Sequence, residues 1–237
     1  MRWTSVAVSI ATCALIPIRS HSQTKDIMDL LARVDHLVYA TPDLNLTVEK
    51  LDRLLGVHAT PGGQHPGRGT RNALIALGPA SYLEIMGPDP EQPKPALPRA
   101  FKIDTLRDAK LAGWGAKTSD LPRLIRDAAV HGVTLGAATS GSRRQPDGGL
   151  LAWQFNDPRV VLGDGIVPFF IDWGNSSHPA RIAAKGASLV ELRAEHPQPD
   201  EVQRVLDQLG IDLRVTKGSE PALIATINGA HGRIELR

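Results

Sequence analysis

The stretch VDHLVYATPDLNLTVEKLDRLLG, residues 34–56, decides the fold. Residues 34–40 form an apolar run typical of a strand, and the Pro-Asp pair that follows ends it. Residues 46–55 then carry apolar side chains at helical spacing. Gly56 follows, at the point where a helix commonly ends in a left-handed residue. The stretch therefore predicts a strand followed by an amphipathic helix.

This succession of strand, helix and glycine occurs twice more along the chain. It returns in GWGAKTSDLPRLIRDAAVHG, residues 113–132, and in SLVELRAEHPQPDEVQRVLDQLG, residues 188–210. The starts lie roughly 75–80 residues apart, the length of one supersecondary unit with several strands. Further strand candidates follow each helix, at residues 72–77, 81–86, 150–155, 166–173, 213–215, 222–227 and 232–236. The sequence predicts an α+β fold of three βαβββ modules, which pair to close a core.

Composition excludes several classes of partner and site. The chain has 27 Lys and Arg residues against 25 Asp and Glu residues, a net charge of +2, without a basic stripe. Nucleic acid is therefore not an expected partner. The single cysteine, Cys13, excludes an intramolecular disulfide and a cysteine-based metal site.

Residues 1–25 differ from the rest and are set apart from the fold. A short basic start and an apolar run over residues 6–18 precede Ser20 and Ser22, the layout of a secretory leader. The run is shorter than the roughly 20 residues of a membrane-spanning helix, so no membrane span is expected. Two alternatives stay open: a leader removed on export, or an apolar extension of a cytoplasmic protein.

Several ordered motifs carry a resemblance to a known family. They are VDHLVYA (34–40), GGQHPGRGTRN (62–72), YLEI (82–85), PFFIDWG (168–174), the pair His178-Pro179 and GRIEL (232–236). Over roughly residues 31–237 the chain resembles the glyoxalase-like domain family of the vicinal oxygen chelate superfamily. The resemblance implies a curved mixed-sheet cup made by two paired modules, residues 31–180. A third module, residues 186–237, would pack on this cup, and the Pro-rich residues 88–98 would link the first module to the second.

The resemblance also implies a metal site at His36 and Glu84. Alternation places His36 on one face of its strand, and it places Glu84 on one face with Tyr82 and Met86. Imidazole nitrogen and carboxylate oxygen suit a divalent ion of Zn, Mn, Ni, Co or Fe, with open positions for substrate oxygens. The alternative is a buried His bonded to Glu84 without metal.

Two protein ligands would leave this site incomplete. In the second module the place of His36 falls on Gly113 or Trp114, neither of which binds metal. His178 and Asp172 are the candidates for a third ligand, and Asp172 is also the candidate catalytic base. The alternative for both is a supporting or surface role.

A second arrangement pairs the third module with the first. Glu191 and Glu235 would then face the same cavity as His36 and Glu84. We favour the cup made by the first two modules, with these two Glu residues facing solvent.

The remaining candidates would contact the substrate. They are His65, Arg71 and Asn72 in the first module, and Arg143, Trp153 and Trp173 in the second. Residues 62–70, rich in Gly and Pro, are expected to form a lid over the cup. Arg143 and Arg144 would bind a carboxylate or phosphate. Exposed loops and core packing are the alternatives.

The sequence thus leads to two hypotheses of function. The first is a divalent-metal-dependent lyase or isomerase that acts on a small oxygenated metabolite bound in the cup. The second is a metal-free protein of the same fold that binds or sequesters a small molecule. A small-molecule substrate is the expected partner, and a homodimer stays open as the alternative to a monomer.

Overall fold

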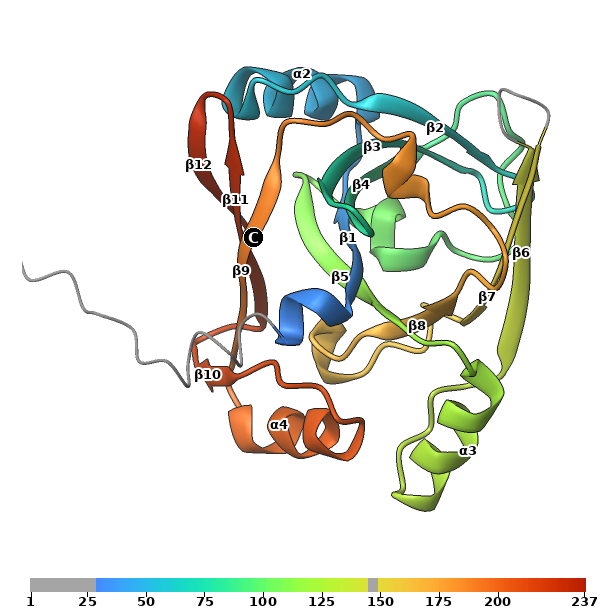
Figure 1. The fold of residues 1–237 in the computed structure, drawn as a ribbon, viewed down its shortest axis with the longest axis vertical. Helices are drawn as coiled ribbons and strands as arrows, with labels where there is room; N and C mark the ends of the chain where they lie inside the picture. The colour runs from blue at the N-terminus through green and yellow to red at the C-terminus, as the bar shows by residue number, and fades with distance from the viewer. Residues whose placement is uncertain (1–28, 145–148) are drawn as a thin grey trace, which may run out of the picture.

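The computed structural model describes residues 29–144 and 149–237, and it contains two separate sheets (Figure 1). The N-terminal segment expected as a leader or extension, residues 1–25, lies outside these described residues. Residues 29–33 are helical, and the helices that follow are α2 (Leu44–Leu55), α3 (Leu121–Val130) and α4 (Pro199–Gln208). The short 3-10 turns are η1 (Ala100–Thr105), η2 (Gly163–Gly165) and η3 (Pro179–Arg181). Among the described residues, no helix has the length and apolar character needed to cross a bilayer.

The larger sheet is a curved, mixed, eight-stranded sheet in the order β2-β3-β4-β1-β5-β8-β7-β6. Its strands are β1 (Val34–Ala40), β2 (Thr60–His65), β3 (Thr70–Gly78), β4 (Ser81–Pro88), β5 (Lys110–Lys117), β6 (Ala138–Arg144), β7 (Leu150–Asn156) and β8 (Phe169–Asp172). Each half is one βαβββ module, in which the first strand lies parallel to the last, β1 to β4 and β5 to β8. The halves join through the antiparallel pair β1 and β5. The predicted α+β fold class, with a curved mixed sheet, is therefore confirmed.

The smaller sheet has four strands in the order β10-β9-β11-β12. They are β9 (Ser188–His196), β10 (Val215–Lys217), β11 (Ala222–Gly229) and β12 (Gly232–Leu236). The succession of elements around α4 is the predicted βαβββ, but the pairing differs from that of the first two modules. Here the first strand, β9, lies between β10 and β11, and the last strand, β12, is an edge strand. In Figure 1 this sheet stands at the left, and α2 lies across the top of the molecule.

The helices form where their caps and apolar faces direct them. Asp43 caps α2 by accepting from the Leu46 amide at 3.0 Å, as N-cap carboxylates do. Gly56 ends α2 in the left-handed region, at φ 68°, and its amide donates to the Asp52 carbonyl. The buried face of α2 includes Leu51 and packs into a core that also contains apolar residues of α4 and β9. One core therefore joins the two sheets.

Two strands at the ends of the larger sheet differ from the prediction. Residues 62–70, expected as a mobile lid, form instead the end of β2 and a tight turn into β3. β6 was likewise not predicted as a strand. Both strands are rich in Gly, Pro, Ser or Thr and pair with one neighbour only, as edge strands do, so they lack an alternating apolar pattern.

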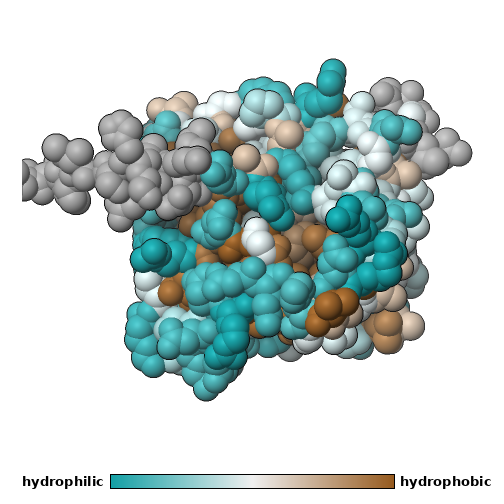
Figure 2. All heavy atoms as spheres, turned by 60° about the horizontal axis from the view of Figure 1, so that its bottom comes forward, coloured by the Kyte–Doolittle hydropathy of each residue, from teal (hydrophilic) through white to brown (hydrophobic). Residues whose placement is uncertain are grey.

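On the face of the molecule seen in Figure 2, hydrophilic residues form most of the surface. Hydrophobic residues are visible mainly in a recess between them. This distribution is ordinary for a protein that buries its apolar side chains in a core.

Candidate functional site

A cavity of about 570 Å³ lies within the curve of the larger sheet, and residues of both modules line it. The first module contributes polar side chains, namely His36, His65, Asn72 and Glu84. The second contributes aromatic side chains, namely Trp153, Phe155, Phe169 and Trp173. The Pro-rich residues predicted as a linker also line it, at positions 95–98. An apolar wall with a few convergent polar groups is typical of a small-molecule site.

His36, on β1, is held in one orientation by its surroundings. Its ring stacks on Tyr82 with centroids 4.8 Å apart, and the edge contact with Phe169 is at 5.2 Å. Gly115 lies opposite on β5, where a Cβ atom would come within 2.8 Å of the imidazole Cε1. The ring therefore occupies space that only a glycine at position 115 leaves open.

Asp35 fixes the other side of the same ring. Its Oδ1 lies 2.7 Å from His36 Nδ1, while its Oδ2 accepts from Trp173 Nε1 at 2.9 Å and lies 3.1 Å from His178 Nε2. Burial by itself raises the pKa of Asp35, but hydrogen bonds from His178 and His36 outweigh it and lower the pKa to about 2. The carboxylate is therefore charged and accepts the Nδ1 proton of His36. When the imidazole is neutral, Nε2 carries its lone pair, and this nitrogen lies 3.7 Å from Glu84 Oε2.

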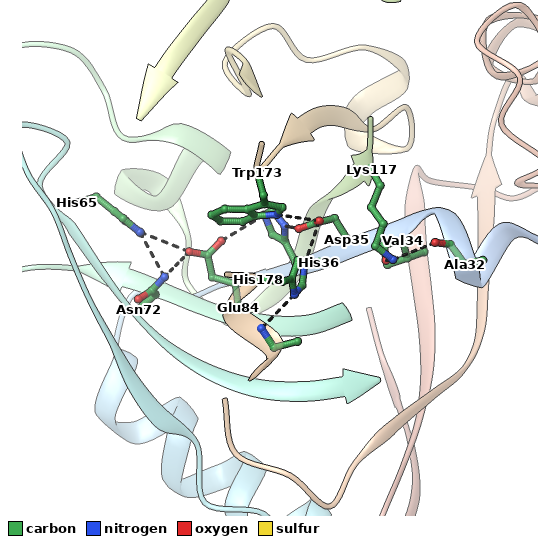
Figure 3. A network of polar contacts seen from close by, with 11 residues as sticks. Ala32, Val34, Asp35, His36, His65, Asn72, Glu84, Lys117, Trp173 and His178 are labelled. Carbon is green, nitrogen blue, oxygen red and sulfur yellow. Dashed lines mark hydrogen bonds and ion pairs between the residues drawn. The ribbon is translucent and has the colours of Figure 1, made fainter. Parts of the chain in front are cut away.

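Glu84, on β4, lies between two imidazole rings (Figure 3). Its Oε2 is 3.7 Å from His36 Nε2, and its Oε1 is 3.5 Å from His65 Nε2. Asn72 Nδ2 also donates to Oε1 at 2.5 Å. Thr70 Oγ1 lies 2.9 Å from His65 Nδ1 and holds that ring from behind. The carboxylate is thus positioned by side chains of β2 and β3.

The donor set of His36 and Glu84 fits a divalent metal ion. One imidazole nitrogen and one carboxylate oxygen lie 3.7 Å apart at the cavity, and the charged Asp35 behind His36 is the usual support of a metal-binding imidazole. Within residues 29–144 and 149–237, no group of three or more His, Cys, Asp or Glu side chains is arranged to hold a metal ion. Further ligands would therefore have to come from substrate or solvent.

Asp172, expected as the base, does not line the cavity. It lies on β8 between the cavity residues Ile171 and Trp173, and alternation turns it to the other face of the strand. Its Oδ1 accepts from the Gly174 amide at 2.8 Å. The expectation of Asp172 in the site is corrected on this geometry.

His178, expected as a ligand, supports Asp35 instead of facing the cavity. Its Nδ1 accepts from the Ala180 amide at 3.1 Å, so its Nε2 carries the proton that it donates to Asp35. Neither ring nitrogen is then left for a metal ion. The supporting role that the sequence left open is the one that the geometry favours.

Several of the remaining candidate residues are not among the side chains that line the cavity. Arg71 lies next to Asn72 on β3 and faces the opposite side, where its Nη2 donates to Asn45 Oδ1 of α2 at 3.3 Å. The side chains of Arg143 and Arg144 lie outside the described part of the structure. Glu235 pairs with Arg193 at 2.8 Å on the smaller sheet, away from the cavity.

Glu191 also belongs to the smaller sheet, on β9. Because β1 pairs with β5, the alternative in which the third module completes the cup is wrong.

Sequence reasoning did not find Asp35. Strict alternation places it on the face opposite His36, but the pairing of β1 with β5 has a register shift between Val34 and His36. Such a bulge turns neighbouring side chains toward one another. An Asp directly beside a candidate ligand His was the only signal in the sequence.

Comparisons with known proteins agree with this architecture. Residues 34–210 match the family described as the glyoxalase-like domain. Among solved structures, a hypothetical protein from Staphylococcus aureus is 15% identical, with a TM-score of 0.61, over 84% of this chain and 92% of that chain. No curated protein matches the chain significantly.

Two matching structures are methylmalonyl-CoA epimerases. The protein from Mycobacterium tuberculosis is 21% identical, with a TM-score of 0.40, over 60% of this chain and 89% of that chain. The protein from Streptomyces coelicolor, in complex with 2-nitronate-propionyl-CoA, is 19% identical, with a TM-score of 0.42, over 61% of this chain and 98% of that chain.

Proposed function

We propose, from the premise that this chain belongs to the glyoxalase-like domain family of the vicinal oxygen chelate superfamily, that it is a divalent-metal-dependent lyase or isomerase. Its substrate would be a small oxygenated molecule bound in the cavity of the larger sheet. One observation carries the proposal: His36 Nε2 and Glu84 Oε2 face each other at 3.7 Å, and a charged Asp35 fixes the proton of His36 on Nδ1.

His36 and Glu84 would hold the ion. When bound, a divalent ion polarises substrate oxygens and raises the acidity of a neighbouring C–H bond. Asp35 keeps the lone pair of His36 Nε2 directed at the cavity, because the Nδ1 proton is committed to its carboxylate. Asn72 holds Glu84 from the opposite side by donating to Oε1.

His65 is our candidate for the group that moves the proton. Its Nε2 lines the cavity beside Glu84, and Thr70 Oγ1 contacts its Nδ1 at 2.9 Å. With Nδ1 donating to the hydroxyl, Nε2 carries a lone pair, which faces the Asn72 amide at 3.3 Å and would take a proton from substrate in its place. In this proposal the base is His65 of β2 and not Asp172. The aromatic side chains of the second module exclude water from the reacting groups.

A metal-free sequestering protein is the less favoured function. Binding an apolar molecule needs apolar surface and does not need a buried carboxylate with three donors around it. Burying charged groups costs free energy, so such an array is expected where chemistry uses it.

Thermal unfolding of the purified chain with Mn²⁺, Ni²⁺, Co²⁺ or Zn²⁺ tests the proposal. An ion that binds only the folded state, at 100 times its Kd, adds about 2.7 kcal/mol to the free energy of unfolding and raises Tm. His36→Ala should remove this rise. His58→Ala, in which a histidine with a 75% exposed side chain is lost, should keep it. If no ion raises Tm and the protein as purified contains no metal, the proposal is wrong.

A further inference from the structure

Arg68 lies in the turn between β2 and β3, at the wall of the cavity. The turn is fixed by several hydrogen bonds. The Arg68 amide donates to the His65 carbonyl at 3.0 Å. The Gly69 carbonyl accepts from the Asp89 amide at 3.0 Å and from Arg99 Nε at 2.6 Å. The backbone that carries Arg68 is therefore held in place rather than free to swing.

The guanidinium of Arg68 reaches across to the second module. Its Cζ lies 4.8 Å from the centroid of the Phe155 ring on β7, a cation–π contact. A cation–π contact does not use the N–H donors of the guanidinium, which can still bind other partners.

Among the side chains that the structure describes, three arginines line the cavity, and two of them are paired with carboxylates. Arg99 binds the Asp104 carboxylate, and Arg159 binds Asp157 at 2.7 Å. Arg68 has no hydrogen-bonding or ion-pairing side-chain partner among residues 29–144 and 149–237. It is nonetheless half-buried, and burial, followed by repulsion from Arg159, lowers its pKa, with Asp157 acting in the opposite direction. A half-buried cation without a direct ion-pair partner is costly unless a ligand supplies one.

We propose that the substrate of this cavity carries an anionic group, a carboxylate or a phosphate, and that Arg68 binds it while the apolar body of the substrate lies against the aromatic wall. The guanidinium fork matches the paired oxygens of either group. The inference rests on the proposed function for the reaction at the other end of the substrate, at His36 and Glu84. It names the class of molecule that this site accepts.

Matched pairs of probes test the charge requirement on the full chain as purified, without added metal. 2-Naphthoate is compared with 2-naphthamide, and 1-naphthyl phosphate with 1-naphthol, by calorimetry and by quenching of tryptophan fluorescence. At least one anion should bind about tenfold more tightly than its neutral counterpart. The pair that shows the preference tells carboxylate from phosphate. If neither anion binds more tightly than its neutral counterpart, the inference is wrong.

Arg68→Gln should remove this preference and leave the affinity for the neutral probe unchanged. Arg126→Gln removes the same charge from the exposed surface of α3 and should retain the preference in full. Arg68→Lys keeps the charge without the fork and should retain part of it, which also covers the case in which Arg68→Gln does not fold. A preference that survives both Arg68 substitutions overturns the inference.

The result is independent of the test of metal binding. A chain that binds no metal but prefers anions through Arg68 contradicts the proposed function alone. A chain that binds metal at His36 but shows no anion preference contradicts only the role of Arg68.

Discussion

A single carboxylate, Asp35, organises the chemistry of the cavity without lining it. It is fully buried, and donors converge on its two oxygens from the neighbouring His36 and from Trp173 and His178, in the segment between β8 and η3. Because its pKa is lowered to about 2, it is charged throughout the neutral range. The direction in which His36 presents its lone pair therefore depends on a residue that touches no substrate.

Asp35→Asn should weaken metal binding by roughly 10–100-fold while the chain still folds, because an amide does not fix the proton of His36 on Nδ1. Calorimetric titration of the purified variant and of the wild type with Mn²⁺ or Zn²⁺ measures the change in affinity. Asp172→Asn is the matched control, since that carboxylate lies outside the cavity wall, and its affinity should equal that of the wild type. Equal affinities of the wild type and Asp35→Asn would contradict this account of Asp35.

At the scale of the strands, the site depends on how closely β1 approaches β5. Alternation correctly predicted that Tyr82, Glu84 and Met86 share one face of β4, and all three line the cavity. It did not predict the neighbour of His36, because the bulge between Val34 and His36 arises from pairing with a strand far away in the sequence.

Gly115→Ala tests this close approach of the two strands. The added Cβ would lie 2.8 Å from His36 Cε1 and 3.0 Å from Nδ1, so the imidazole must move. We expect the free energy of unfolding to fall by about 1–3 kcal/mol, as at other overpacked positions. We also expect the variant to lose most of its affinity for metal. Gly113→Ala, on the same strand, adds a carbon 3.0 Å from Phe101 and should leave metal affinity near that of the wild type. Chemical unfolding measures the stability of both variants, and metal titration measures their affinity. If Gly115→Ala binds metal as tightly as Gly113→Ala, the close approach of the strands does not position His36.

At the scale of the molecule, the repeat was readable because each helix carries its own local signals. Asp43 caps the start of α2 and Gly56 caps its end, and Asp120 caps the start of α3. All three act through contacts within a few residues. How the strands of the third repeat pair was not readable, because the same succession of elements allows more than one sheet order. The partners of Asp35 were not readable either, because Trp173 and His178 lie more than a hundred positions away in the chain.

Leu206→Ala tests whether the smaller sheet and the larger sheet unfold together. Leu206 of α4 is fully buried in the core that the two sheets share, so its truncation should cost about 2–5 kcal/mol. The tryptophans of the described residues, Trp114, Trp153 and Trp173, all lie outside the smaller sheet. A fall in the midpoint of the fluorescence transition would therefore report one cooperative unit. Val130→Ala, at an 82% exposed site, is the control and should leave the midpoint unchanged.

The two halves of the larger sheet have the same topology, yet the titratable groups that face each other across the cavity come from one half and the aromatic wall from the other. With two halves of the same topology, the side chains of one half can be changed while those of the other are kept. Substitutions at Trp153, Phe155 or Phe169 would then change which molecule enters, with His36, His65 and Glu84 left as they are. The halves are still tied together, because Trp173 and His178 of the second half hold Asp35 and Arg68 of the first half packs on Phe155.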